Sequence, residues 1–263
     1  QSSNKNIQRL YKLSDIKSKI DFCVIATSSE PRFKILKKLL RLEISNFLVE
    51  KVVFQSNYQF QEINKLLGNK KVYVNFVNRY FKNYIEIKKD IDNNSFTMDI
   101  VGGDFGLACN ALHYFDLFKY FGNKELELSS FNLQENINGN RRGVIYKEVE
   151  GQISVYSKNG SSLNISSNTK RSGDVEIIIK YSNKTHVINE GLLEHIKFFN
   201  KGITREPLVV KYTSLLTAEI YKDILKNKCL LPVVSDCQEI HSILFKSVNK
   251  ALKLNPEDKC PIT

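Results

Sequence analysis

An apolar run at residues 21–27, DFCVIAT, followed at once by a helical pattern, constrains the fold more than any other feature. Such a run, entered by an acid and left by small polar residues, is typical of a parallel strand buried on both faces. Apolar residues then recur at helical spacing at Phe33, Leu36, Leu39 and Leu40. The segment is therefore predicted to be a buried strand that leads into a covering helix.

The same pattern continues through two more strands. Apolar strand patterns occur at 46–51 and 72–77, and a second helical pattern at 60–67 lies between them. Alternation of strands and helices with short connections predicts right-handed crossovers and a parallel sheet with covered faces. Residues 1–78 are therefore predicted to form half of a doubly wound α/β domain.

Residues 79–263 have a different texture, dominated by short runs with a period of two and turn signals such as Asn159-Gly160. Strands are expected at 96–101, 127–133, 144–149, 153–156, 163–165, 175–181 and 186–188. Helices are expected at 107–121, 214–227 and 236–254. This part is predicted to be a mixed, mostly antiparallel sheet domain with packed helices. One sheet face then lacks a helical layer, which predicts a homo-oligomer built through that sheet.

Composition narrows the classes of partner. A net charge of +11 suits nucleic acid, an anionic surface or a phosphorylated small molecule. The basic residues are interspersed with acids and form no cluster with aromatics, so no nucleic-acid partner is predicted. No apolar run approaches the ~18–20 residues of a membrane helix. Five cysteines without a CxxC pair or a zinc-like histidine spacing predict reduced thiols in a cytoplasm and no metal.

Polar residues follow each predicted strand of the first sheet, where ligands bind in open parallel sheets. Thr27 and Ser28 follow the first strand, Glu50 and Lys51 the second, and Arg79 the third. A lysine directly behind a buried strand is partly desolvated, which lowers its pKa and suits it to proton transfer. Lys51 is therefore a catalytic candidate, although polar strand ends are equally common in plain loops.

The predicted helix at 107–121 carries a second group of candidate catalytic residues. Cys109, His113 and Asp116 share one stripe of this helix. A carboxylate that holds an imidazole fixes its tautomer and raises its pKa, as a general acid or base requires. His113 with Asp116 is therefore a candidate acid–base pair, and a satisfied core histidine is the alternative.

These pieces, in this order, resemble the glucose-fructose oxidoreductase, inositol dehydrogenase and MocA-like family of NAD(P)-dependent sugar oxidoreductases. The matching segments are residues 21–27, Glu50 with Lys51, residues 78–81, Gly102 with Gly103, and His113 with Asp116. Less specific matches are Ser214, Leu216, Thr217, Leu231, Pro232 and His241. The resemblance implies a Rossmann domain followed by a substrate domain, and hydride transfer between NAD or NADP and a sugar or nucleotide sugar. Polysaccharide biosynthesis is one setting for such a reaction.

The resemblance also implies roles for individual residues. Lys51 would polarise the reacting oxygen, His113 would exchange its proton, and Asp116 would orient His113. The cofactor would be lined by Thr27, Ser28, Glu50 and Lys51. The substrate would be bound by Arg79, Gly103 and Asn110.

The sequence departs from the family pattern in three places. Val52 replaces the proline of the Glu-Lys-Pro motif, and a trans Lys51–Val52 bond is expected because a non-proline cis bond costs ~2.5–4 kcal/mol. Cys109 stands where many relatives have an aspartate. The phosphate-binding GxGxxG turn does not occur. Two alternatives follow: the first Rossmann strands lie outside this sequence, or the chain is a non-catalytic binding or regulatory protein that has lost dinucleotide binding.

Overall fold

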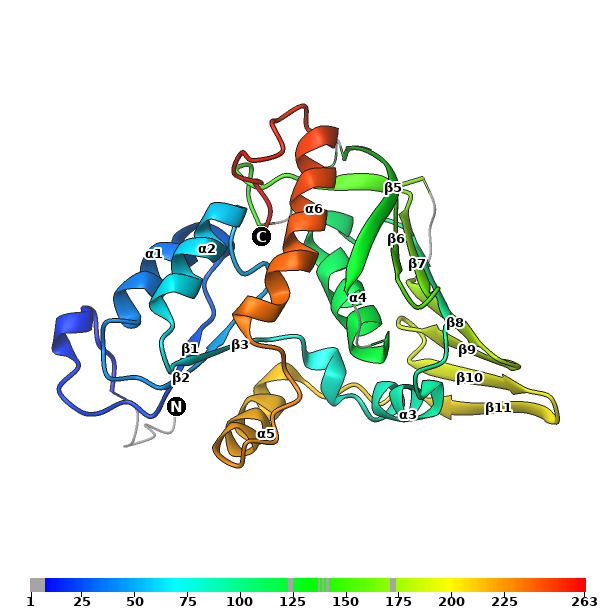
Figure 1. The fold of residues 1–263 in the computed structure, drawn as a ribbon, viewed down its shortest axis with the longest axis horizontal. Coiled ribbons are helices and arrows are strands. Elements are labelled where there is room, and N and C mark those ends of the chain that lie inside the picture. Colours follow the sequence, from blue (N-terminus) through cyan, green and yellow to red (C-terminus); the bar gives the residue numbers. More distant parts are fainter. Residues whose placement is uncertain (1–7, 123–124, 137, 139, 141, 171–173) are drawn as a thin grey trace.

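The computed structural model describes residues 8–122, 125–136, 138, 140, 142–170 and 174–263 (Figure 1). These residues form a three-stranded sheet of order β1-β2-β3 and an eight-stranded sheet of order β11-β10-β9-β8-β4-β7-β6-β5. Figure 1 shows the two sheets at opposite sides of the molecule, with α4 and α6 between them. The prediction of a small parallel sheet followed by a mixed sheet domain is confirmed.

The first sheet follows from its apolar runs, but the prediction that its first strand is buried on both faces was wrong, because this strand lies at an edge of the sheet and Val24 is 46% exposed. Its parallel strands are β1 (Phe22–Ile25), β2 (Asn46–Val49) and β3 (Lys71–Val74). The connections contain α1 (Ser29–Leu39) and α2 (Asn57–Leu66). β2 lies in the middle and is the most deeply buried strand, so its carboxyl end delivers the next residues into the interior of the protein.

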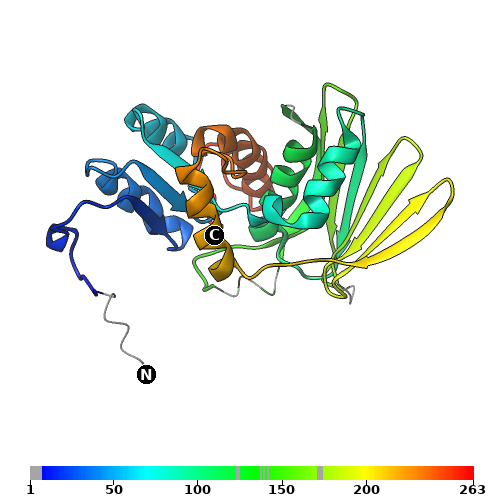
Figure 2. The same cartoon turned by 90° about the horizontal axis from the view of Figure 1, so that it is seen from below.

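The second sheet is antiparallel at every pairing except that of β4 with β7. Its strands are β4 (Thr97–Gly102), β5 (Leu126–Glu135), β6 (Val149–Ser157), β7 (Ser162–Ser167), β8 (Glu176–Tyr181), β9 (Lys184–Asn189), β10 (Glu194–Phe199) and β11 (Gly202–Pro207). Figure 2 shows the helices gathered on one side of this sheet.

Three details of the strand prediction were wrong. Residues 144–148 form turns rather than a strand, and Val144 is 93% exposed despite its β-branched side chain. Only the last residue of the strand expected at 144–149 belongs to a strand, and it lies in β6 together with the strand expected at 153–156. β10 and β11 were not predicted, because β11 is an exposed edge strand and neither strand shows a clean alternation of apolar and polar residues.

Helices pack between the sheets and along the inner face of the larger one. They are α3 (Lys82–Ile91), α4 (Leu107–Gly122), α5 (Thr213–Leu225) and α6 (Gln238–Ala251), with 3₁₀ turns η1 (Leu13–Asp15), η2 (Val77–Tyr80) and η3 (Val234–Cys237). α4 is buried almost all round, because α6 covers one side and β6 and β7 the other. Within the described ranges, no helix combines the length and apolar character needed to cross a membrane.

The C-terminal segment returns to the first sheet. Val74 N–H donates to the Pro232 carbonyl (2.9 Å), and the hydroxyl of Ser29 donates to the Ile262 carbonyl (2.5 Å). The Cys260 N–H donates to the Gln55 carbonyl (2.7 Å). Residues beyond 230 therefore complete the core around β1–β3. The domain boundary at residue 78 remains a prediction.

Candidate functional site

Lys51 lies at the carboxyl end of β2 and is only 8% exposed. Its Nζ donates to the Cys109 carbonyl (2.8 Å) and to Asn110 Oδ1 (3.2 Å), both in the first turns of α4. Burial lowers the pKa of Lys51 below the usual 10.5, while nearby acidic groups oppose this shift. The structure therefore places a partly desolvated ammonium between the first sheet and α4.

The Lys51–Val52 peptide bond is cis, so the expectation of a trans bond was wrong. The surrounding groups hold this segment in place. The guanidinium of buried Arg32 donates to the Val52 carbonyl, and Val53 N–H donates to His241 Nε2 (3.1 Å). His241 Nδ1 faces the Cys237 carbonyl at 2.8 Å, which fixes its tautomer. These are tertiary contacts that the local sequence does not reveal.

A polar cavity of about 240 Å³ opens beside Lys51. Its lining consists of Lys51, Asp104, Phe105, Gly106, Cys109, Asn110, Asn140, Arg142 and Glu148. Burial raises the pKa of the Cys109 thiol to about 11, so the thiol stays protonated at neutral pH. The same small cavity is lined by the cations Lys51 and Arg142 and by the carboxylates Asp104 and Glu148. This arrangement suits a polyhydroxylated ligand.

The buried carboxylate of Glu148 belongs to this site, and sequence reasoning missed it. It accepts hydrogen bonds from the Ala108 N–H at the start of α4 and from its neighbour Val149 N–H (3.1 Å). Burial raises its pKa. Glu148 lies 40 positions from Ala108 in a segment predicted to be a strand, so no local pattern pointed to the site.

His113 lines a second cavity, of about 320 Å³. The other lining residues are Asn78, Phe105, Asn110, Tyr114, Val175 and Glu190. Asn110 and Phe105 contribute to both cavities, and Asn110 Nδ2 donates to the Phe105 carbonyl (2.6 Å). The structure therefore brings together three predicted site residues, Lys51, Asn110 and His113, as neighbours along two adjoining cavities.

The predicted electrostatics of His113 were wrong. Burial, with a contribution from the charge of Lys51, lowers its pKa to about 3. Its Nδ1 is inaccessible to solvent and has no hydrogen-bond partner among the described residues. His113 is therefore a neutral imidazole with an unpaired nitrogen.

Asp116 does not orient His113, which corrects the prediction of an acid–base pair. It is 2% exposed and accepts two hydrogen bonds from Arg79, at 2.9 Å from Nε and 2.7 Å from Nη2. Arg79 also donates to the Leu230 carbonyl (3.1 Å), and its guanidinium lies over the Tyr120 ring. Neither Arg79 nor Asp116 lines either cavity. The two form a buried ion pair between η2 and α4.

Of the predicted cofactor residues, Lys51 lines the smaller cavity, whereas Thr27, Ser28 and Glu50 lie at the strand ends and line neither cavity. Glu50 accepts a hydrogen bond from Asn75 Nδ2 (2.7 Å). Thr27 Oγ1 and Asn75 Oδ1 are buried without partners in the described structure. Ser28 precedes α1 and makes no side-chain cap. Gly103, predicted to bind substrate, lies outside both cavities, and its carbonyl accepts from Ser167 Oγ (2.7 Å).

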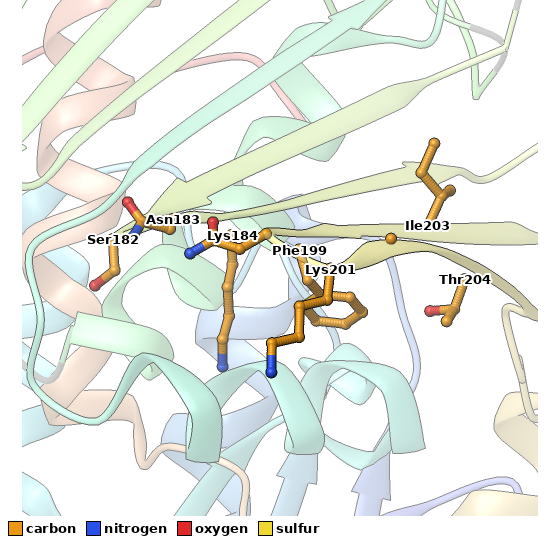
Figure 3. A pocket seen from close by; sticks show the side chains of 9 residues that line it. Ser182, Asn183, Lys184, Phe199, Lys201, Ile203 and Thr204 are labelled. Carbon is orange, nitrogen blue, oxygen red and sulfur yellow. The ribbon is translucent and has the colours of Figure 1, made fainter.

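A larger cavity, of about 640 Å³, lies at the tips of the β8–β9 and β10–β11 hairpins. Figure 3 shows its lining, which includes Phe199, Ile203, Lys184 and Lys201. Lys184 forms an ion pair with Asp90. This lining contains no carboxylate, imidazole or thiol, and its ionisable groups are the amines of Lys184 and Lys201.

No protein-family model and no curated protein sequence matches the chain. Solved structures do match. A dehydrogenase (MviM) from Clostridium difficile is 19% identical with a TM-score of 0.70, over 88% of this chain and 79% of that one. UDP-N-acetylglucosamine 3-dehydrogenase GnnA from Acidithiobacillus ferrooxidans is 10% identical with a TM-score of 0.68, over 89% and 78%. A super-repressor mutant of Gal80p from Saccharomyces cerevisiae is 14% identical with a TM-score of 0.64, over 90% and 80%.

These likenesses define the fold. The chain shares with these structures the fold that its sequence led us to expect, a small parallel sheet followed by a mixed sheet with packed helices. The same architecture occurs in a dehydrogenase and in Gal80p, so the function must be argued from the site.

Proposed function

We propose that this protein is an NAD(P)-dependent oxidoreductase that transfers a hydride between nicotinamide and a carbon of a sugar or nucleotide sugar. The observation that carries the proposal is the buried ammonium of Lys51, held against α4 beside adjoining cavities that also contain Asn110 and His113. The likeness to a UDP-N-acetylglucosamine dehydrogenase and the net charge of +11 support a nucleotide-linked substrate, as in polysaccharide biosynthesis.

Lys51 is positioned to act on the reacting oxygen. An ammonium has three N–H donors, and the Cys109 carbonyl and Asn110 Oδ1 accept two of them. The third can donate to a substrate oxygen and stabilise the alkoxide that develops as hydride leaves. The neutral imidazole of His113 can accept a hydrogen bond from the substrate hydroxyl. The negative charge that develops on this oxygen would raise the low pKa of His113 and let it take up the proton.

The strand ends fit the nicotinamide end of the cofactor. Thr27 Oγ1 and Asn75 Oδ1 are buried oxygens that lack partners in the described structure, and Glu50 fixes the amide of Asn75. Amide and hydroxyl groups of a nicotinamide riboside would satisfy them. When bound, NAD or NADP accepts or supplies the hydride. The sequence contains no GxGxxG turn, so we assign no residue to the pyrophosphate.

Substitution of His113 tests this function. With wild-type chain, NAD or NADP and a panel of sugars and UDP-sugars, we expect substrate-dependent reduction of the nicotinamide. His113→Asn should lower kcat by roughly 10²- to 10⁴-fold, because it removes the proton acceptor. Cys109→Ala should retain most activity, since its thiol is protonated. Full activity in folded His113→Asn would remove His113 from the mechanism.

The second candidate function is a non-catalytic regulator that keeps the fold. The likeness to Gal80p, a transcriptional regulator, and the lack of a GxGxxG turn favour it. Fluorescence titration with NADH distinguishes the candidates when combined with the turnover assay. Binding or ligand recognition without turnover for any sugar in the panel would support the regulator over the oxidoreductase.

We further propose a homo-oligomer built through the outer face of the larger sheet. There an apolar row of Ile178, Val187 and Ile196 crosses neighbouring strands, with Asp99 at one end and Arg205 at the other. A twofold axis can place the acidic end of one row opposite the basic end of its partner. Over β6 and β7 this face is polar, with serine, asparagine and glutamine side chains.

Light scattering tests the oligomer. The wild-type chain should behave as a dimer or larger assembly, and Ile196→Lys should shift it toward monomer because a charge replaces the centre of the apolar row. Ser154→Lys, on the polar half, is the matched control and should leave the mass unchanged. A monomeric wild type would contradict this interface.

We also propose a cytoplasmic location for the protein, a compartment in which its five free cysteines would stay reduced.

A further inference from the structure

Glu190 is a second carboxylate in the candidate site that sequence reasoning missed. It follows β9 directly and lines the same cavity as His113. Its Oε2 accepts a hydrogen bond from the hydroxyl of buried Tyr114 (3.1 Å), the residue next to His113 on α4. The phenol packs edge-on against the Phe105 ring, with 6.0 Å between ring centroids. These contacts hold one carboxylate oxygen and leave the other for a ligand.

Glu190 has fewer partners than the buried acids Asp116 and Glu148. Asp116 is paired with Arg79, and Glu148 is held by two backbone N–H groups. In the described part of the chain, no lysine or arginine lies within ion-pair distance of Glu190. A carboxylate in a low-dielectric site without a cation is costly.

The second oxygen of Glu190 is available to a ligand. Glu190 lines a cavity of about 320 Å³, and its only side-chain hydrogen bond among the described residues is the one from Tyr114 to Oε2. Asn78 and Asn110 add amide groups to the lining. A ligand that supplied several donors and one positive charge would satisfy Glu190.

We propose that this cavity binds a primary ammonium group of the substrate, held by Glu190. An ammonium brings three N–H donors and the missing positive charge, whereas a hydroxyl brings one donor and no charge. The proposal rests on the proposed function for the sugar itself, and it narrows the substrate class to sugars with a free amine. The reacting oxygen is assigned to Lys51 and His113, so it and the amine at Glu190 occupy different parts of the site.

Three hexoses that differ only at carbon 2 test the proposal by calorimetric titration at neutral pH. D-glucosamine carries an ammonium, D-glucose a hydroxyl and N-acetyl-D-glucosamine a neutral amide. D-glucosamine should bind the wild-type chain roughly 10- to 100-fold more tightly than the other two, the usual range for a charge-assisted hydrogen bond. Glu190→Gln should abolish this preference. Glu194→Gln, four positions further on at the start of β10, is the matched control and should keep it.

Tyr114→Phe is the second variant, for the case that Glu190→Gln does not fold. It keeps the carboxylate but removes the hydrogen bond that positions it, so the preference for the amine should shrink without disappearing. Equal binding of the three sugars, no binding of D-glucosamine, or a preference that survives in folded Glu190→Gln would each overturn the proposal. The titration contains no nicotinamide. A protein that prefers the amine but never transfers hydride would therefore contradict the oxidoreductase function and leave the amine site standing.

Discussion

Replacement of Lys51 by methionine is expected to lower kcat by at least roughly 10²- to 10³-fold, the usual loss when a preorganised donor at a developing oxyanion is removed. Methionine keeps the length and most of the volume of the lysine stem, so packing behind β2 should survive. The loss should therefore appear in kcat at unchanged folding, measured by steady-state kinetics together with a melting curve. Lys65→Met is the control, because Lys65 is 72% exposed and makes only a surface ion pair with Glu62.

The pH profile provides an independent readout of Lys51. Stabilisation of an alkoxide requires the protonated amine, and burial lowers the Lys51 pKa below 10.5. Activity should therefore fall as the pH rises through this lowered pKa, at a lower pH than an ordinary lysine would give. The alkaline limb should be absent from the residual activity of Lys51→Met. Unchanged kcat and an unchanged limb in the folded variant would contradict the proposed role.

Replacement of Asp116 by asparagine is expected to destabilise the protein by roughly 3–5 kcal/mol, because it leaves the Arg79 guanidinium buried without its carboxylate. Denaturant unfolding measures this loss. The kcat of the folded fraction should stay near the wild-type value, since Asp116 does not line either cavity. A general drop in kcat at unchanged stability would instead support the role that the helical stripe first suggested for Asp116.

A double variant sharpens this test. Arg79→Met combined with Asp116→Leu removes both charges and fills their volume with apolar atoms. Its loss of unfolding free energy should be clearly smaller than the sum of the two single losses, because no unpaired buried charge remains. An additive loss would mean that the two side chains do not stabilise each other.

A residue of the candidate site could be predicted from the sequence when it lay next to a clear strand or helix pattern. Lys51 follows β2, in which Asn46 is followed by three apolar residues, and the topology of a parallel sheet places the ends of such strands at one edge. Asn110 and His113 lie on a helix whose apolar periodicity is clear over 107–121. Local patterns were therefore enough to place these three residues near one another. They were not enough for Glu148 and Glu190, which reach the cavities from segments with no motif.

The sequence by itself determined the succession β1, α1, β2, α2, β3 and the existence of α4, because each of these elements carries an apolar pattern of strand or helical spacing. Only the tertiary structure decided which partner each buried charge has. Asp116 shares a stripe with His113, yet its carboxylate is bound by Arg79 from another segment. A hydrogen bond depends on the positions of two atoms within a few ångströms, and those positions follow from packing between segments rather than from spacing along one of them.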